Sequence, residues 1–193
     1  IIGRLYGTAE LAAYGLGVNI LSVCFVVGFG FSIAGSTLVG QHLGAGDPDG
    51  AVRSGRQALA LAVLSMAAIG VTIIALAEPI ARLLVDDEKV VGLAVSFIWI
   101  LGAVQPLMAV EFALGGALRG AGDTRFPLKA TLMGLLVMRC GLAFLFVSLG
   151  LSVEWVYGAL VGDYAAKALL LWLRFRSGRW KTVIGNERLG LAS

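Results

Sequence analysis

Four ionisable residues lie inside long apolar stretches of this sequence: Glu111, Arg139, Asp163 and Lys167. Because a charge is costly in hydrocarbon, such residues mark candidate sites for ion or substrate binding. Arg139 and Asp163 each lie twelve residues from Leu151, in a turn between two apolar runs, so both fall about 18 Å along a helix from that turn and can pair. Lys167 follows Asp163 at i+4 spacing. The cluster fits either a neutralised structural group or a relay for substrate or protons.

Glu111 differs from the other three because no basic residue lies within one turn of it on its own helix. Desolvation favours the neutral form of an isolated carboxyl, which can hold and release a proton, or bind Na⁺ if other oxygens converge. Upstream, Pro106 interrupts the backbone hydrogen bonding and Gln105 adds an amide at that point. Secondary transporters build midplane sites from such broken helices. We therefore predict a coupling-ion or substrate site from Glu111, Gln105, Asp163 and Arg139. A Glu111 that snorkels or pairs with another helix is the alternative.

The composition indicates that a membrane surrounds these side chains. Of the 193 residues, 59% are hydrophobic and 14% are charged, against about 45–50% and about 25% in soluble domains. The mean hydropathy is +0.91. Five apolar runs are long enough to span a bilayer, near residues 12–40, 55–77, 90–118, 127–150 and 152–174. We predict an all-α, polytopic helix bundle in which residues 1–181 form one partial lobe and residues 182–193 form a tail.

The basic residues are distributed unevenly between the two ends of these runs. Ten of the fifteen Lys and Arg residues follow the first, third and fifth runs: Arg53, Arg56, Arg119, Arg125, Lys129, Arg174, Arg176, Arg179, Lys181 and Arg188. Cytoplasmic loops are enriched in Lys and Arg, so these loops and the C-terminus are expected in the cytoplasm. The only histidine, His42, falls in one such loop, where we expect it to have no partner. No motif for an enzyme, a cofactor or nucleic-acid binding accompanies this pattern.

The tetrapeptide GAGD occurs at 44–47 and again at 120–123, each time after an apolar run. Neither copy fits a phosphate-binding motif, which needs further glycines or a Lys-Ser/Thr pair at fixed spacing. Turn chemistry explains both copies, with Gly44 and Gly120 as the left-handed residues that end each helix. The residues preceding the copies do not align, so the tetrapeptide does not show a duplication.

The residues that follow the second glycine of each GAGD copy predict where the next helix begins. Asp47 is a favourable N-cap, and Pro48 suits the first helical position after it. In the second copy Asp123 or Thr124 can cap, with Pro127 in the opening turn. Both loops are therefore predicted to be tight helix–turn–helix corners.

Four ordered segments resemble motifs of the multidrug and toxic compound extrusion (MATE) transporters: GTAELAAYGLGVNI, GFSIAGSTLVGQHLGAGDPDGA, GALRGAGDTRFP and LRFRSGRWK. Members of that family have twelve spans in two six-helix lobes. The resemblance implies that these five runs are spans 8 to 12 of the C-terminal lobe, truncated at the N-terminus. Span 7 and the N-terminal lobe are then further partners that complete the transporter.

The resemblance also implies an activity, the antiport of amphipathic organic cations or drugs coupled to H⁺ or Na⁺ in a bacterial or archaeal cell membrane. Many members carry an acidic residue in the tenth span, which matches Glu111 by region. No cofactor is expected beyond the coupling ion, and no metal beyond Na⁺ at Glu111. Two alternatives stay open: a lipid-linked oligosaccharide flippase of the same superfamily, for which a basic cavity is expected, and a truncated membrane protein that does not transport.

Overall fold

The computed structural model describes residues 8–85 and 87–182, and no strand occurs in this part of the chain. The elements, in chain order, are α2 (Thr8–Gly44), α3 (Pro48–Ala75), α4 (Ala77–Leu84), α5 (Glu88–Gly120), α6 (Arg125–Met133), the π-helix η1 (Gly134–Gly141), α7 (Leu142–Ser148), α8 (Val153–Arg176) and the 3₁₀-helix η2 (Arg179–Thr182). The predicted all-α class is confirmed. Of the expected tail at 182–193, residues 183–193 lie outside the described residues.

The five expected spans correspond to α2, α3, α5, the run α6–η1–α7, and α8. Four helical stretches are long and apolar enough to cross a membrane: Leu11–Gly44, Pro48–Ala75, Val90–Gly120 and Arg125–Ser148. The fifth, α8, is not among them, although its 24 residues give a length of about 36 Å. It carries Asp163 and Lys167, which lower its hydropathy. Helices α2 and α3 extend past the apolar runs to the GAGD turn.

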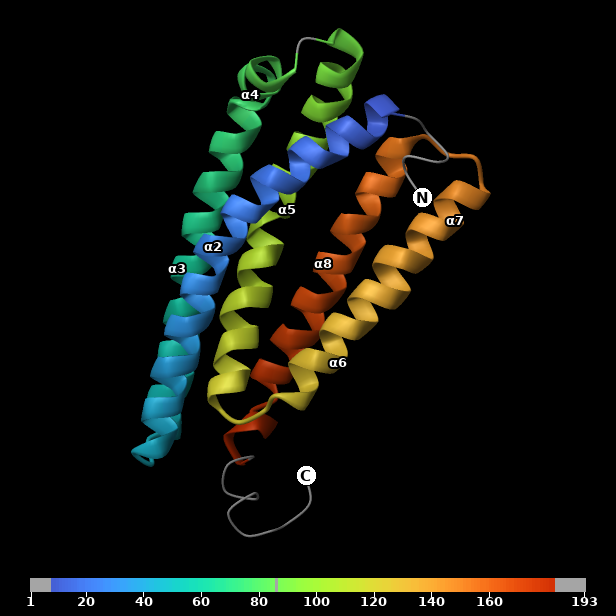
Figure 1. Ribbon diagram of the computed structural model, residues 1–193. Coiled ribbons are helices and arrows are strands. Elements are labelled where there is room, and N and C mark those ends of the chain that lie inside the picture. The colour runs from blue at the N-terminus through green and yellow to red at the C-terminus, as the bar shows by residue number, and fades with distance from the viewer. Residues whose placement is uncertain (1–7, 86, 183–193) are drawn as a thin grey trace.

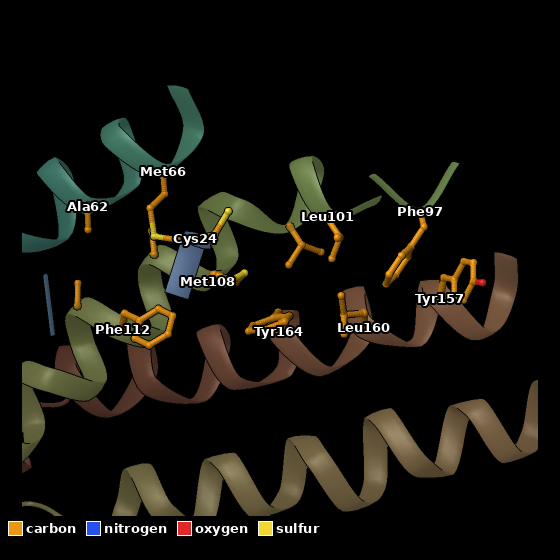
Figure 2. Packing of buried hydrophobic residues seen from close by; sticks show 13 residues of the cluster. Cys24, Ala62, Met66, Phe97, Leu101, Met108, Phe112, Tyr157, Leu160 and Tyr164 are labelled. Carbon is orange, nitrogen blue, oxygen red and sulfur yellow. The ribbon is translucent and has the colours of Figure 1, made fainter. Parts of the chain in front are cut away.

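Helix α5 is central to the bundle (Figure 1), where it packs against α2, α3 and α8. The run α6–η1–α7 packs mainly on α8 and lies away from α2 and α3 (Figure 1). Figure 2 shows the main buried cluster, to which Cys24 of α2, Met66 of α3, Met108 of α5 and Tyr164 of α8 contribute. Side chains on both sides of α5 thus hold the other helices around it.

Helices α2 and α5 approach each other closely because glycines line their contact. A Cβ added at Gly116 would collide with the backbone of Ser32, and one added at Gly120 would collide with the backbone of Ser36. These two glycines are four residues apart, so they lie on one face of α5. Small residues at such spacing let membrane helices pack backbone against backbone. We call this contact the α2–α5 seam.

Both GAGD turns end a helix with the same hydrogen-bond pattern, but the left-handed residue is not the one expected. Positive φ angles occur at Gly46 (75°) and Gly122 (81°), whereas Gly44 and Gly120 remain the last residues of α2 and α5. At the first turn, Asp47 N–H donates to the His42 carbonyl at 2.8 Å and Gly46 N–H to the Leu43 carbonyl at 3.1 Å. This is a Schellman motif, which places the left-handed residue after the helix end. The assignment to the first glycine of each copy was wrong by two residues.

The two corners cap the next helix differently. Asp47 Oδ1 accepts the Gly50 N–H at 2.7 Å and Pro48 is the first residue of α3, so the predicted cap is confirmed. The expectation that His42 has no partner was wrong, since its Nδ1 lies 3.1 Å from Asp47 Oδ2. At the second corner, Asp123 accepts the Phe126 N–H at 3.4 Å and also the Nε–H of Arg174 at 2.7 Å. The second corner is therefore tied to the end of α8.

Candidate functional site

The four ionisable residues that the sequence singled out meet in one network, which we call the charged quartet. Lys167 Nζ lies 3.0 Å from Glu111 Oε2 and 3.2 Å from Asp163 Oδ1, and Arg139 Nη2 lies 2.7 Å from Asp163 Oδ2. Helices α5, η1 and α8 each contribute to it. The expected pairing of Arg139 with Asp163 is present, as is the contact of Lys167 one turn away. The isolation expected for Glu111 is wrong, because Lys167 reaches it from α8.

The quartet combines two acids and two bases, so its formal charge is zero. The exposed fraction of the side chain is 0% for Asp163, 7% for Lys167, 18% for Glu111 and 35% for Arg139. Burying one charge without a partner costs several kcal/mol, so each buried charge here needs the opposite charge beside it. The ring of Tyr164 adds a cation–π contact, with its centroid 4.2 Å from Lys167 Nζ.

The ion pairs do not use up the hydrogen-bonding capacity of the carboxylates. Both oxygens of Asp163 and Oε2 of Glu111 are buried, and each of these atoms has one cationic group of Lys167 or Arg139 beside it. A carboxylate oxygen accepts more than one hydrogen bond, so these atoms can still receive a proton or another donor. The quartet is thus a place where protonation changes the local balance of contacts.

Gly134, the first residue of η1, positions Arg139 against α8. A Cβ at Gly134 would collide with Asp163 Oδ1 and meet the Lys167 side chain at 2.7 Å, so only glycine lets η1 lie this close. Arg139 stands within η1, a π-helix with a wider turn than an α-helix. Short π segments occur often at functional sites. No motif in the sequence indicated this segment.

Gln105 lies apart from the charged quartet, although the sequence placed it in the same site. Its side chain is fully buried, its Nε2 donates to the Leu101 carbonyl at 3.2 Å, and its Cβ packs against Gly70 of α3. Six residues along a helix turn the side chain by about 240° from Glu111, so the two residues face different neighbours. Gln105 belongs to the contact between α3 and α5.

A cavity of about 540 Å³ opens beside Glu111 and is lined by residues of α2, α5, α6 and α8. Its apolar wall includes three phenylalanines, Phe25, Phe29 and Phe112. The Phe112 ring centroid lies 5.3 Å from that of Phe25 and 5.3 Å from that of Phe29. Ligand sites are typically concave and largely apolar with a few placed polar groups. The geometry therefore offers an aromatic surface next to one carboxylate.

The far part of the same cavity is polar and includes a residue that sequence reasoning did not select for the site. Arg119 lines the cavity and its Nη2 donates to Ser32 Oγ at 2.8 Å. Two helical turns separate Arg119 from Glu111 along α5. The spacing of the two residues was visible in the sequence, but the cavity that joins them forms only when α2 packs on α5.

No group of three or more His, Cys, Asp or Glu side chains able to hold a metal ion occurs within residues 8–85 and 87–182. The two cysteines, Cys24 and Cys140, are free thiols. Glu111 and Asp163 are the carboxylates of the quartet, and a lysine lies against both of them. A Na⁺ ion at Glu111 therefore stays a prediction.

Comparison with known proteins relates both the sequence and the fold to one group. The family model MatE matches residues 1–145. A probable multidrug resistance protein NorM of Thermotoga maritima is 30% identical over 188 residues, which cover 95% of this chain and 40% of that protein. Another, of Rhizobium meliloti, is 33% identical over 179 residues, covering 88% of this chain and 38% of the relative.

Among solved structures, a crystal structure of MATE in the bent conformation superposes with a TM-score of 0.80. At 22% sequence identity this likeness shows the fold, and it covers 93% of this chain and 40% of the other. The chain thus spans about two fifths of the length of the curated relatives it matches.

Proposed function

The chain belongs to the MatE family, and on this premise we propose that it forms part of a secondary active efflux transporter that exchanges H⁺ or Na⁺ for amphipathic organic cations. One observation carries the proposal: Glu111 is the acidic side chain that lines the 540 Å³ cavity, and it belongs at the same time to the charged quartet. A cation in the cavity and a proton on the quartet therefore meet at one carboxylate.

Competition for Glu111 provides the coupling. While Glu111 is ionised it can pair with an organic cation, and once it is protonated that attraction is lost. Two ligands that exclude each other at one group are linked reciprocally, as antiport requires. A Na⁺ ion at the same carboxylate would act in the same sense.

Lys167 keeps the electrostatic cost of this exchange low because it has a second carboxylate partner. Its ammonium lies 3.0 Å from Glu111 and 3.2 Å from Asp163, so it can leave Glu111 without losing its counter-ion. Asp163 in turn keeps Arg139 at 2.7 Å. Lys167, Asp163 and Arg139 thus compensate the charge that appears or disappears at Glu111.

The aromatic wall accounts for the class of substrate. Phe25, Phe29 and Phe112 offer ring faces to an apolar ligand, and rings attract cationic groups as well. The excess of Lys and Arg near the GAGD turns supports an orientation with these turns and the C-terminus in the cytoplasm of a bacterial or archaeal cell. The remainder of a MATE-type transporter is the expected protein partner.

The proposal is tested by ethidium binding to the purified chain in phosphatidylcholine nanodiscs. We expect acidification to weaken binding to the wild type. Loss of a contact with a charged group costs about 1.5–3 kcal/mol, so Glu111→Gln should weaken binding by roughly tenfold or more and remove its pH dependence. Glu78→Gln, a change at an exposed residue of α4, is the matched control. Ethidium binding that is equal in the Glu111→Gln variant and the wild type at every pH would remove Glu111 from the mechanism.

Ion coupling needs a second measurement, in dye-loaded vesicles that carry the transporter containing this sequence. An imposed pH gradient and an imposed Na⁺ gradient are applied separately. We expect one of them to drive dye efflux in the wild type and neither to do so in Glu111→Gln. Efflux by the variant under the same gradient would place the coupling elsewhere.

A further inference from the structure

A second cavity lies at the end of α3 and α8 that is away from the charged quartet, and the chain after α8 closes it. The backbone turns at Gly178, whose φ is 68°, and Trp180 is then fully buried. The indole Nε1 donates to the Phe175 carbonyl at 2.8 Å, and the two rings stack with centroids 5.0 Å apart. These contacts fix η2 against α8 and direct Lys181 back towards α3.

Helix α3 approaches the same place through a glycine. A Cβ at Gly55 would come within 2.6 Å of the Phe175 ring, so the ring of α8 occupies the space that a side chain would need. On the other side, Lys181 Nζ lies 3.9 Å from Asp49 Oδ1 of α3. The walls of the cavity are therefore held by α3, α8 and η2 together.

Three cations and an apolar surface line this cavity of about 310 Å³. The cations are Arg56 of α3, Arg176 of α8 and Lys181 of η2. Val52, Leu59, Trp172 and Phe175 form its apolar part, with Trp172 40% exposed. Arg176 lies over the Trp172 ring, 5.1 Å from its centroid.

The positive charge here is not neutralised within the part of the chain that the structure describes. Neither Arg56 nor Arg176 has a carboxylate within ion-pair distance among those residues, and Lys181 has only the distant contact with Asp49. A cluster of unpaired cations facing one hollow attracts a multivalent oxygen anion, and guanidinium groups match phosphate geometry in particular.

We propose that this cavity binds the phosphodiester headgroup of an anionic phospholipid. Arg56, Arg176 and Lys181 contact the phosphate, while Trp172 and Leu59 lie against the acyl chains. Basic hollows between membrane helices, at the level where the helices leave the bilayer, are suited to such headgroups. The apolar half of the lining favours a lipid over free phosphate. The inference rests on the membrane-spanning helices and is independent of the transport activity proposed above.

The test uses native mass spectrometry of the purified chain in non-ionic detergent, with phosphatidylglycerol and phosphatidylcholine supplied in equal amounts. We expect the wild type to retain phosphatidylglycerol preferentially. Each basic residue near a membrane surface strengthens attraction to anionic lipid about fivefold, so the double variant Arg56→Gln, Lys181→Gln should lose at least tenfold in occupancy. The double variant Arg125→Gln, Lys129→Gln carries the same change of charge near the second GAGD turn, outside the cavity, and should stay within twofold of the wild type.

Three outcomes would overturn the proposal. Equal losses in the two double variants would reduce the effect to general surface charge. Displacement of the lipid by inorganic phosphate at comparable concentration would identify a free-anion site, and equal retention of phosphatidylcholine would exclude headgroup recognition. The double variant Arg56→Lys, Lys181→Arg, which keeps both charges, should retain most of the binding and shows that the loss in Arg56→Gln, Lys181→Gln is not a failure to fold.

Discussion

Asp163 is the residue on which the balance of the charged quartet depends, since it is fully buried and lies between Arg139 and Lys167. Removing one partner of a buried ion pair leaves the other uncompensated, which typically costs about 3–5 kcal/mol. We predict that Asp163→Asn lowers the free energy of unfolding by about 3 kcal/mol, measured by denaturation followed by circular dichroism.

Two variants control this prediction. Asp49→Asn changes a carboxylate that is 82% exposed and should stay within about 0.5 kcal/mol of the wild type. The double variant Asp163→Asn, Arg139→Gln restores the balance of charge around Lys167 and Glu111 and should be more stable than the single variant. A single variant as stable as Asp49→Asn would show that the quartet is not electrostatically coupled.

Asp47 offers a pH dependence outside the membrane-spanning helices. The Gly50 N–H above all, with His42 and Arg53 nearby, holds the pKa of Asp47 below its ordinary value of 3.8. A lowered folded-state pKa contributes stability that is present above the ordinary value and is lost as pH falls through the lowered one. We predict that the thermal midpoint falls on acidification in this range and that Asp47→Asn, which keeps a capping side chain, reduces this fall. Parallel curves for the two proteins would contradict it.

At the scale of single residues, the sequence predicted part of the site. Arg139 and Asp163 could be paired from the sequence, because each lies the same number of residues from the turn between their helices and so at the same depth. The contact between Lys167 and Glu111 needed the adjacency of α5 and α8, and counting along one helix cannot supply it. Gln105 was placed in the site by its nearness to a proline in sequence, but the rotation of the helix turns it towards α3.

At the scale of the helices, the close packing of α2 on α5 depends on Gly116 of α5. The neighbouring Gly115 has different surroundings. A methyl group at Gly116 would collide with the Ser32 backbone, whereas one at Gly115 would meet only the flexible Arg119 guanidinium at 3.5 Å. We predict that Gly116→Ala lowers the free energy of unfolding by about 1–3 kcal/mol through overpacking. Gly115→Ala should cause no loss, because alanine favours the helix over glycine.

The comparison of these adjacent variants by thermal unfolding separates packing from helix propensity. If Gly115→Ala were as unstable as Gly116→Ala, the cause would be the loss of glycine as such. Equal stability of Gly116→Ala and the wild type would mean that α2 and α5 separate readily.

The elements themselves followed from apolar length and turn chemistry. The corners, the cap at Asp47 and the extent of five helical segments could be read locally, since each depends on residues close in the chain. The left-handed glycines were misplaced because Schellman geometry puts the turn residue after the helix end, at Gly46 and Gly122. The π-helix η1 could not be anticipated, because it accompanies the contact of Gly134 with α8.

For the whole molecule, the charged quartet lies where three elements meet, because α5, η1 and α8 each contribute a side chain to it. Helices α2, α3 and α5 form one group, α8 packs on α5 and contributes to the main buried cluster, and the group α6–η1–α7 lies on α8 (Figure 1). Composition and the order of motifs were sufficient to assign the family, since these depend on the chain as a sequence. The assembly of the quartet and of both cavities depends on how the groups pack, and no local pattern records it.

The α2–α5 seam has a mechanical consequence. Around Gly116 and Gly120 the two backbones are in direct contact, so α2 and α5 cannot slide past each other there without first separating. We therefore expect α2 and α5 to move together as one rigid unit when the protein changes conformation. Movement is then expected mainly in the lightly packed run α6–η1–α7. Arg139 lies on that run and pairs with Asp163, so it transmits such movement to the quartet.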